Sequence, residues 1–491
     1  MKKVINNISN FFSKMSKKTK ITILVVTLLI LGVTVLYQTF ATSSTINGDS
    51  TNGYTVTLDN SGTVSIPASG SKTVYFKVKN TNNATVKYGV GYSGSNITVK
   101  EYSDSDNPST GTISKGESKF VKLYISNSGT SASTATLTTI LGYENGGDLI
   151  VPSGYTLVTS IYTVPVNLVT HITKLYTSAS KTEVTNNSIT YNYAASVGLM
   201  NDRLGSMSTG IDAGNIRYYG ANPNNYIYFN CDDYSNQTDT TCEKWRIIGV
   251  FDGKVKIMRN ETIGRYSYDN KNTNTGAESN HGKNNWSDAR LMKMLNAGYE
   301  SETGGSLYWN RQSGTCYSGA TADTTKTCDM SSIGLKNDIT RNMISETTYS
   351  LLGWNTAEIY SDQIYNYERT TGSVYNETTR DKSWTGKVAL AYPSDYGYAA
   401  DLSQCSQTLY DYDNSTCKSN DWMFNSVFQL LLTPSSGNSD YVWSVYGSGY
   451  VSTGSYATAE LDMRPVLFLG SELGIKAGDD GSNSAPYQLS A

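Results

Sequence analysis

The chain has 491 residues, with 39 basic and 42 acidic side chains and a formal net charge of −3 at pH 7. Six lysines lie in the first 20 residues, before the first acidic residue, Asp49, so the rest carries 33 basic against 42 acidic residues, a net charge of −9. This acidic balance argues against nucleic acid or an anionic lipid surface as the main partner. A chain of this length is expected to hold two or three domains.

An apolar stretch follows the basic head directly. It runs from Ile21 to Leu36 and trails off to Ala41, which gives about 20 residues, the length of a membrane-spanning helix. Positive charge stays in the cytoplasm, so residues 1–20 are expected inside and the bulk outside. We expect residues 21–41 to be a single-pass membrane anchor. Because Thr39-Phe40-Ala41 resembles a cleavage site, the alternative is a signal that is cut near Ala41 and a secreted protein.

Residues 42–53 form a Ser/Thr/Asn/Gly-rich linker, and short alternating strands are predicted over 54–169. The alternation has a period of two, no helical segment interrupts it, and the spacing is typical of an antiparallel β-sandwich. The phrase that begins at Gly111 and ends before Asn127 resembles the immunoglobulin-like modules of bacterial surface proteins, which usually serve as spacers or stalks. The predicted strands are 54–58, 73–79, 85–90, 120–125 and 135–141.

Residues 170–195 are expected to connect this sandwich to an α+β domain over 196–491. Asp252-Gly253 predicts a tight hairpin turn between two apolar strands. A helix is predicted to start at Ser287 and to end at Gly298, since serine caps helix N-termini and glycine ends helices. A second helical stretch is expected over 335–352. Further strands are predicted at 226–229, 245–251, 254–258 and 463–469.

All six cysteines lie beyond residue 230, in three couples of similar spacing. An even count in an exported chain indicates disulfides rather than a metal site, and no C-x₂-C knuckle is present. The sequential pairing closes the shortest loops. We therefore predict the bridges Cys231–Cys242, Cys316–Cys328 and Cys405–Cys417.

A set of motifs in fixed order resembles a family of exported proteins of unknown function in Gram-positive-type bacteria. The resemblance covers roughly 195–490 and implies a C-type-lectin-like domain, of the branch shared with the formylglycine-generating enzyme. Together with the apolar stretch and the alternating strands, this resemblance predicts the fold class: a multidomain, β-rich chain with a transmembrane helix, an immunoglobulin-like β-sandwich and an α+β lectin-like domain. The motifs are 222–226, 229–230, 245–249, 286–290, 295–296, 392–399, 464–467, 478–482 and 486–487.

The sequence carries no motif that predicts catalysis. The chain has two histidines, His171 and His281, and lacks a G-x-S-x-G elbow, an H-E-x-x-H helix and a phosphate loop. We expect no catalytic residue, no cofactor and no dedicated metal site. Asp-rich loops at 232–233, 411–413 and 479–481 could hold calcium loosely, although turn formation explains them better.

The segment 435–456 is built of Tyr, Trp, Ser, Gly and Asn, the residue types that antibody loops use for contact. An ordinary hairpin with exposed tyrosines is the alternative. The sequence therefore predicts a non-enzymatic cell-surface protein, a stalk with an adhesin-like head for an extracellular protein or glycan. The alternatives are a structural envelope protein and an extracellular carbohydrate hydrolase. The predicted ligand-binding residues are Tyr441, Trp443, Tyr446, Tyr450 and Tyr456.

Overall fold

The computed structural model describes residues 58–80, 84–142, 149–162, 165–203, 214–271 and 280–490. They divide into two compact units, with the boundary between Val164 and Pro165. The prediction of a β-rich chain with more than one domain is confirmed. The expected head, anchor and linker, residues 1–53, lie outside the described residues. Within the described ranges, no helix is long and apolar enough to cross a membrane.

The first unit consists of two sheets that share one core. Alternate residues of the strands point inward, as Val121, Leu123 and Ile125 do on one long strand, while their neighbours face water. One sheet contains β1 (Leu58–Ile66), β7 (Ser133–Leu141), β3 (Val86–Ser93), β5 (Thr110–Ile113) and β8 (Thr156–Leu157). The other contains β2 (Ser71–Lys79), β6 (Ser118–Asn127), β4 (Ile97–Tyr102) and β9 (Ile161–Tyr162). The predicted β-sandwich is thereby formed.

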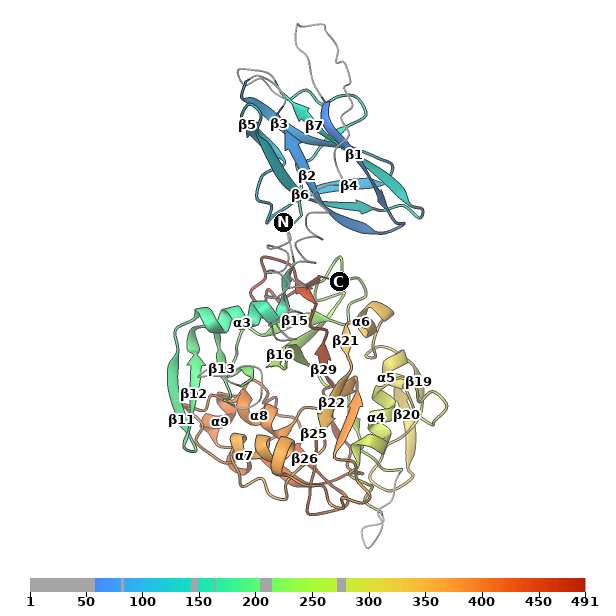
Figure 1. The fold of residues 1–491 in the computed structure, drawn as a ribbon. Helices are drawn as coiled ribbons and strands as arrows, with labels where there is room; N and C mark the ends of the chain where they lie inside the picture. The colour runs from blue at the N-terminus through green and yellow to red at the C-terminus, as the bar shows by residue number, and fades with distance from the viewer. Residues whose placement is uncertain are drawn as a thin grey trace, which may run out of the picture. The chain divides into compact units, whose positions relative to one another are not determined.

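A large antiparallel sheet organises the second unit (Figure 1). The predicted hairpin turn is confirmed, because Asp252 and Gly253 adopt the positive φ angles of 47° and 74° that a tight hairpin needs. The strand order is β11 (Thr182–Asn186), β12 (Ile189–Ala194), β13 (Leu199–Asn201), β14 (Ile216–Tyr218), β16 (Glu243–Phe251), β17 (Lys254–Arg259), β29 (Val466–Leu469) and β21 (Ile344–Ser345). In addition, β15 (Tyr226–Phe229) pairs with β16, and β24 (Val388–Ala389) pairs with β29.

Smaller sheets surround the large one. A five-stranded sheet contains β18 (Arg265–Tyr266), β28 (Leu461–Asp462), β25 (Gln429–Pro434), β26 (Tyr441–Val445) and β27 (Val451–Tyr456). A three-stranded sheet contains β10 (Val166–Asn167), β30 (Gly474–Ile475) and β31 (Leu489–Ser490). One hairpin pairs β19 (Ser313–Tyr317) with β20 (Thr325–Asp329). The strands β22 (Thr347–Ser350) and β23 (Ser383–Gly386) also pair, across the long intervening segment 351–382.

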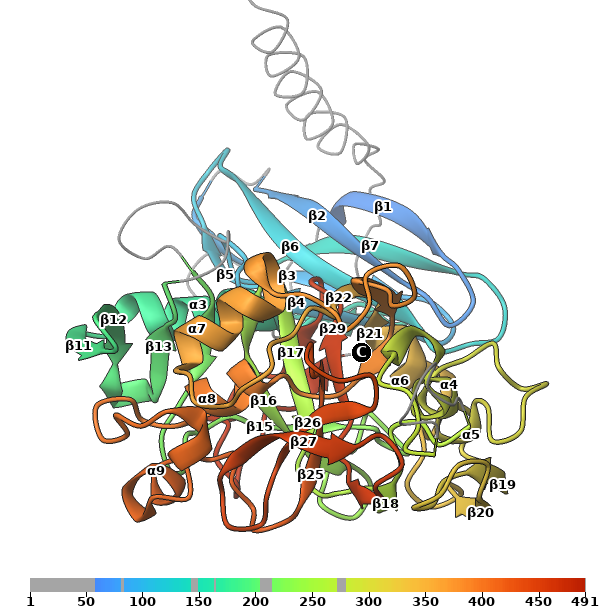
Figure 2. The ribbon, with the colours of Figure 1, turned by 90° about the horizontal axis from the view of Figure 1, so that it is seen from below.

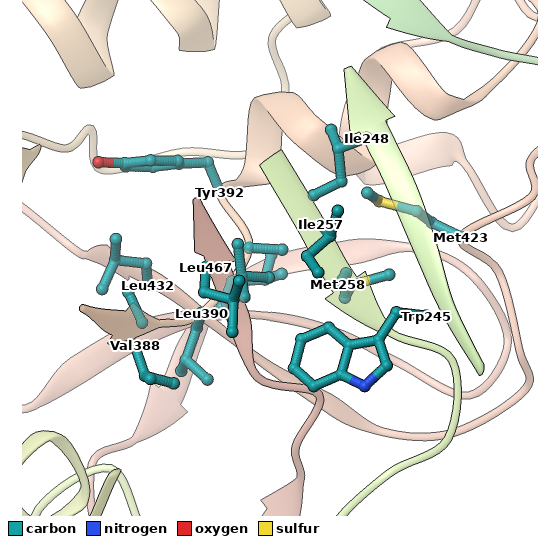
Figure 3. Packing of buried hydrophobic residues seen from close by; sticks show 14 of the residues in the cluster. Trp245, Ile248, Ile257, Met258, Val388, Leu390, Tyr392, Met423, Leu432 and Leu467 are labelled. Atoms are coloured by element: carbon teal, nitrogen blue, oxygen red, sulfur yellow. The ribbon is translucent and has the colours of Figure 1, made fainter. Parts of the chain in front are cut away.

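Short helices cover the two sides of the central strands. Two of them, α7 (Ser361–Asn366) and α8 (Pro393–Ala399), pack together on one side, whereas α4 (Arg290–Leu295) and α5 (Leu307–Asn310) lie on the other (Figure 2). The other α-helices of the described ranges are α3 (Leu168–Ser178), α6 (Asp338–Met343) and α9 (Ser415–Ser419). Between the layers, Trp245, Met258, Leu390 and Leu467 pack closely, and Tyr392 lies at the edge of this packing (Figure 3).

Residues 170–195, which we expected to be a connector, are instead part of the second unit. Leu168, Ile172 and Tyr176 recur at helical spacing on α3 and are buried in the core of this unit. Strand β12 pairs with β13 and so extends the large sheet. The apolar stripe opposite a polar face is the ordinary signal of an amphipathic helix, so this helix was detectable from the sequence.

The two predicted helices are shorter than expected. Ser287 lies in a 3₁₀ turn, where its hydroxyl donates to Asn285 at 3.0 Å and to Asp381, so it does not cap α4. Helix α4 begins one turn later, at Arg290, and ends at Leu295. Within 335–352 only α6 is helical, and two short strands follow it. The β-branched Ile344, Thr347 and Thr348 favour those strands.

The three predicted disulfides are all present. The Cys405–Cys417 bridge closes a loop beside α9, and both its cysteines are buried. Replacing this pair by alanine is expected to lower the free energy of unfolding by about 3 kcal/mol, because the unfolded chain gains the entropy of the opened loop. Urea unfolding of the full chain measures it. Peptide mapping without reduction checks that the other two bridges remain, and an unchanged midpoint would contradict the expectation.

Candidate functional site

The hairpin of β26 and β27 places the five predicted contact residues very differently. Trp443 is fully buried, and its indole Nε1 donates to the carbonyl oxygen of Trp354 at 3.3 Å. Tyr441, Tyr446 and Tyr450 are half-buried, and Tyr456 is 39% exposed. Trp443 is therefore a core residue, and its assignment to the contact surface is corrected: no ligand reaches a side chain that is sealed inside the domain.

The four tyrosines belong to two separate ring clusters. Tyr446 and Tyr450 flank the hairpin turn and stack at a centroid distance of 4.2 Å, and Phe428 lies 3.9 Å from Tyr446. Tyr456 stacks on His281 at 3.9 Å and meets Tyr441 at 5.0 Å, edge to face. Much of each ring face is thus covered by another ring of the same chain. The segment forms two small aromatic surfaces rather than one continuous platform.

The second unit also contains a hollow of about 520 Å³. It lies between the large sheet, the paired strands β22 and β23, and α7. Its walls combine aromatic rings with hydroxyl, amide and charged groups, which is the mixture typical of small-ligand sites. The lining residues are Asn215, Phe251, Asp252, Lys254, Glu346, Thr347, Thr348, Tyr349, Ser350, Tyr365, Arg369, Ser383, Tyr392 and Phe468.

Two cations line the hollow: Lys254, whose Nζ donates to the carbonyl oxygen of Glu346 at 3.1 Å, and Arg369. Arg369 lies on a π-helical turn, Tyr367–Thr371, directly after α7. Its guanidinium carbon lies 3.8 Å from the ring centroid of Tyr392 and 5.1 Å from that of Tyr365. Its Nη1 approaches Glu368 Oε2 at 3.6 Å, too far for a hydrogen bond. Within the described part of the chain, Nη1 is buried without a hydrogen-bond partner. A guanidinium held by rings and not by acceptors has donors to offer to a ligand.

Behind the wall, Asp395 binds two buried cations. It accepts from Arg217 Nη1 at 3.1 Å and from Lys256 Nζ, and the backbone N–H of Tyr392 donates to it at 3.0 Å. Arg217 also donates through Nε to Asp202 at 2.6 Å. Burial alone would raise the pKa of Asp395, but Lys256 and Arg217 outweigh it and hold that pKa below its usual value. Burial lowers the pKa of Lys256 to about 8, against the attraction of Asp395.

Glu368 is the third buried acid of this cluster. It accepts the backbone N–H of Ser394 at 3.0 Å and the hydroxyl of the same serine. Burial raises the pKa of Glu368 to about 7, although Arg369 and Ser394 favour the ionised form. The carboxyl group therefore changes its charge near neutral pH, directly beside Arg369.

Local sequence explains how α8 brings these groups together. Pro393 stands in the first turn, where a missing N–H costs nothing, and Asp395 accepts the N–H of Tyr392 as a capping side chain does. All seven residues of α8 are buried. In the sequence, the motif 392–399 indicates a family resemblance, but it gives no sign that Asp395 forms buried ion pairs. Lys256, which stands between Val255 and Ile257 on β17, is a local signal of a buried ion pair.

The polar residues considered as metal ligands or bases have structural partners. Asp233 and Asp480 accept backbone N–H groups two residues later, at Ser235 and Ser482, which is turn chemistry. His171 lies 3.3 Å from the hydroxyl of Tyr487. Among the described residues, no three His, Cys, Asp or Glu side chains gather as a metal ion requires.

Comparison of the chain with protein families, with curated proteins and with solved structures finds no significant match. The family resemblance drawn from the motifs therefore stays a prediction.

Trp443 and Tyr456 lie on the same hairpin, and their replacement tests whether the first is a core residue and the second a surface residue. Replacing Trp443 by alanine is expected to cost about 3–5 kcal/mol of the free energy of unfolding, because it opens a cavity in the core. Replacing Tyr456 by alanine is expected to cost about 1 kcal/mol or less. Chemical denaturation of both variants checks this, and equal losses would show that the burial difference is wrong.

Glu368 predicts a pH dependence of stability. An acid whose pKa rises on folding holds its proton more tightly in the folded state, so stability falls as the pH rises through the window from its ordinary value, 4.5, to about 7. The full shift corresponds to about 3 kcal/mol. Glutamine does not ionise, so Glu368→Gln lacks this pH-dependent loss of stability. The difference in the free energy of unfolding between the variant and the wild type is therefore expected to shift in favour of the variant from about pH 5 to about pH 8. Denaturation at several pH values measures the difference.

Glu346 lies on the exposed rim of the same hollow and is the matched control. In Glu346→Gln the pH profile of stability is expected to follow the wild type. A Glu368→Gln profile parallel to the wild type would contradict the assignment of the titration to Glu368.

Proposed function

We propose that the protein is an exported cell-surface protein whose second unit binds a ligand and whose sandwich acts as a stalk. Residues 1–20 stay in the cytoplasm, residues 21–41 anchor the chain or are cleaved, and the two folded units lie outside the cell. The proposal includes the immunoglobulin-like class for the sandwich and the C-type-lectin-like class for the second unit. Those classes are supported by the sequence motifs and by the two-sheet and α+β architectures described above.

The hollow beside Arg369 carries the binding function. Its volume of about 520 Å³ falls within the range of about 300–1,000 Å³ that small-ligand sites occupy. Five aromatic rings supply apolar contact, and an arginine that lacks hydrogen-bond acceptors supplies donors. The Arg369 side chain is 25% exposed, and a ligand that accepts from it would recover part of the free energy that a poorly partnered guanidinium costs.

A second candidate surface is the aromatic hairpin. Tyr456 is exposed, and Tyr410, at 50% exposure, extends the cluster of Tyr446 and Tyr450 at 5.8 Å from the latter. Exposed tyrosines of this kind bind proteins and glycans, since they offer an apolar ring and a polar tip. This surface keeps the adhesin interpretation open for an extracellular protein or a glycan, with Trp443 removed from it.

One binding screen with three variants separates these sites. Thr347→Trp on β22 is expected to fill the hollow from its rim, while Thr327→Trp adds the same side chain to an exposed position on β20 of the β19–β20 hairpin. A third variant changes Tyr441, Tyr446, Tyr450 and Tyr456 to alanine. The full chain is screened by isothermal titration against N-acetylated amino acids, neutral and acidic monosaccharides, soluble glycans and purified surface proteins.

Binding that is lost in Thr347→Trp and kept in Thr327→Trp, with equal melting temperatures, is the expected outcome. Loss only in the four-tyrosine variant would move the function to the aromatic hairpin. A well-folded wild type that binds nothing would overturn the proposal and favour a structural envelope protein.

A further inference from the structure

One partly buried cation beside the hollow, Arg369, has no acid within hydrogen-bond distance. Three cations, Arg217, Lys256 and Arg369, face three acids in the buried cluster. Asp395 takes both Arg217 and Lys256, and Asp202 takes Arg217 as well, with a side-chain exposure of 1% or less at all four groups. Arg369 is left with Glu368 at 3.6 Å and with ring faces. Its guanidinium is therefore the cation of the cluster that a ligand in the hollow can reach.

Aromatic walls restrict the kind of anion. The rings of Phe251, Tyr349, Tyr365, Tyr392 and Phe468 line the hollow around Arg369. A fully hydrated anion such as phosphate would lose its water beside these rings without gaining hydrogen-bond donors for its remaining oxygens. A carboxylate attached to a ring or another apolar group would match both the aromatic walls and the guanidinium. The apolar group would pack against the rings, and the carboxylate would form two parallel hydrogen bonds with the guanidinium. The acids on the rim, Asp252 and Glu346, are exposed and therefore screened.

Glu368 and such a carboxylate would compete for the same cation. Both would be negative, close together and shielded from water, which is unfavourable unless one of them takes up a proton. Glu368 is fully buried, whereas the ligand brings its charge to the guanidinium donors. The proton then comes from solvent to the Glu368 carboxylate, and Arg369 turns from Glu368 to the ligand.

We infer that the hollow binds the carboxylate of an aromatic or similarly apolar acid on Arg369, and that Glu368 takes up one proton as the acid binds. This inference rests on the proposed binding function of the hollow. The groups that act on Glu368 are Arg369 on its own turn, Ser394 and Asp395 on α8 and Tyr392 before α8. One step further out, Tyr365 on α7 lies against Arg369, and Lys256 on β17 and Arg217 on β14 bind Asp395. Lys256 also has a pKa of about 8, so it is the rival proton acceptor.

The test uses benzoate and its neutral isostere benzamide, titrated calorimetrically into the full chain, with acetate and inorganic phosphate as further probes. Benzoate is expected to bind at least about tenfold more tightly than benzamide, acetate or phosphate, because only benzoate satisfies the rings and the guanidinium together. Its affinity is expected to rise by up to about tenfold per unit as the pH falls from about 8 toward about 7, the slope for uptake of one proton. Titrations in buffers of different ionisation heat count that proton directly.

Variants assign the roles. Arg369→Gln is expected to abolish benzoate binding, and Arg369→Lys to weaken it about tenfold, because lysine keeps the charge but lacks the two-pronged geometry. Glu368→Gln is expected to bind benzoate at about pH 8 as tightly as the wild type does at low pH, with no pH dependence and no proton uptake. Arg265→Gln removes an exposed arginine from a distant strand and is expected to change nothing.

The outcomes separate the two proposals. Equal affinity for benzoate and benzamide, or pH dependence that persists in Glu368→Gln, would overturn the inference; the latter would assign the proton to Lys256. Binding of a neutral monosaccharide that is lost in Thr347→Trp would support the proposed binding function of the hollow but would contradict carboxylate recognition by Arg369. A wild type that binds none of these probes, nor any compound of the wider screen, would overturn both.

Discussion

Asp395 holds three parts of the second unit together from a position that water does not reach. Its carboxylate joins Arg217 of β14, Lys256 of β17 and the first turn of α8. Removing one partner from such a group leaves a buried charge uncompensated, at a cost of about 3–5 kcal/mol. The position of α8 on the sheet is therefore fixed. A shift of α8 along β14 or β17 would separate Asp395 from Arg217 or from Lys256.

The hollow follows from this constraint. Because Asp395 takes two of the buried cations, Arg369 keeps only a distant approach to Glu368 and the ring faces of Tyr392 and Tyr365. The π-helical turn after α7 adds to the effect, since such turns are costly and frequently mark functional sites. Within this cluster, Arg217 and Lys256 are thus fixed by acids, and the guanidinium of Arg369 is left available to a ligand.

Features with local causes were predictable from the sequence. The Asp252-Gly253 hairpin, the alternating sandwich strands and the three short-range disulfides all depend on residues close together in the chain. The ion cluster was not predictable, because it unites positions from 202 to 395 that only the folded sheet and α8 bring together. Ser287 misled the helix prediction for a similar reason: its hydroxyl bonds Asn285 and Asp381, and the second of these is 94 residues away.

The aromatic hairpin shows why composition alone does not locate a binding site. Tyrosine and tryptophan serve contact surfaces and β-sheet packing equally well, and only burial separates Trp443 from Tyr456. Where rings stack on one another, as Tyr446 does on Tyr450, the faces that a ligand would use are already occupied. The rings of the hollow enclose open space beside a guanidinium that lacks acceptors. Selective recognition needs both an apolar wall and a fixed polar group, and among the described residues those two requirements meet most completely at Arg369.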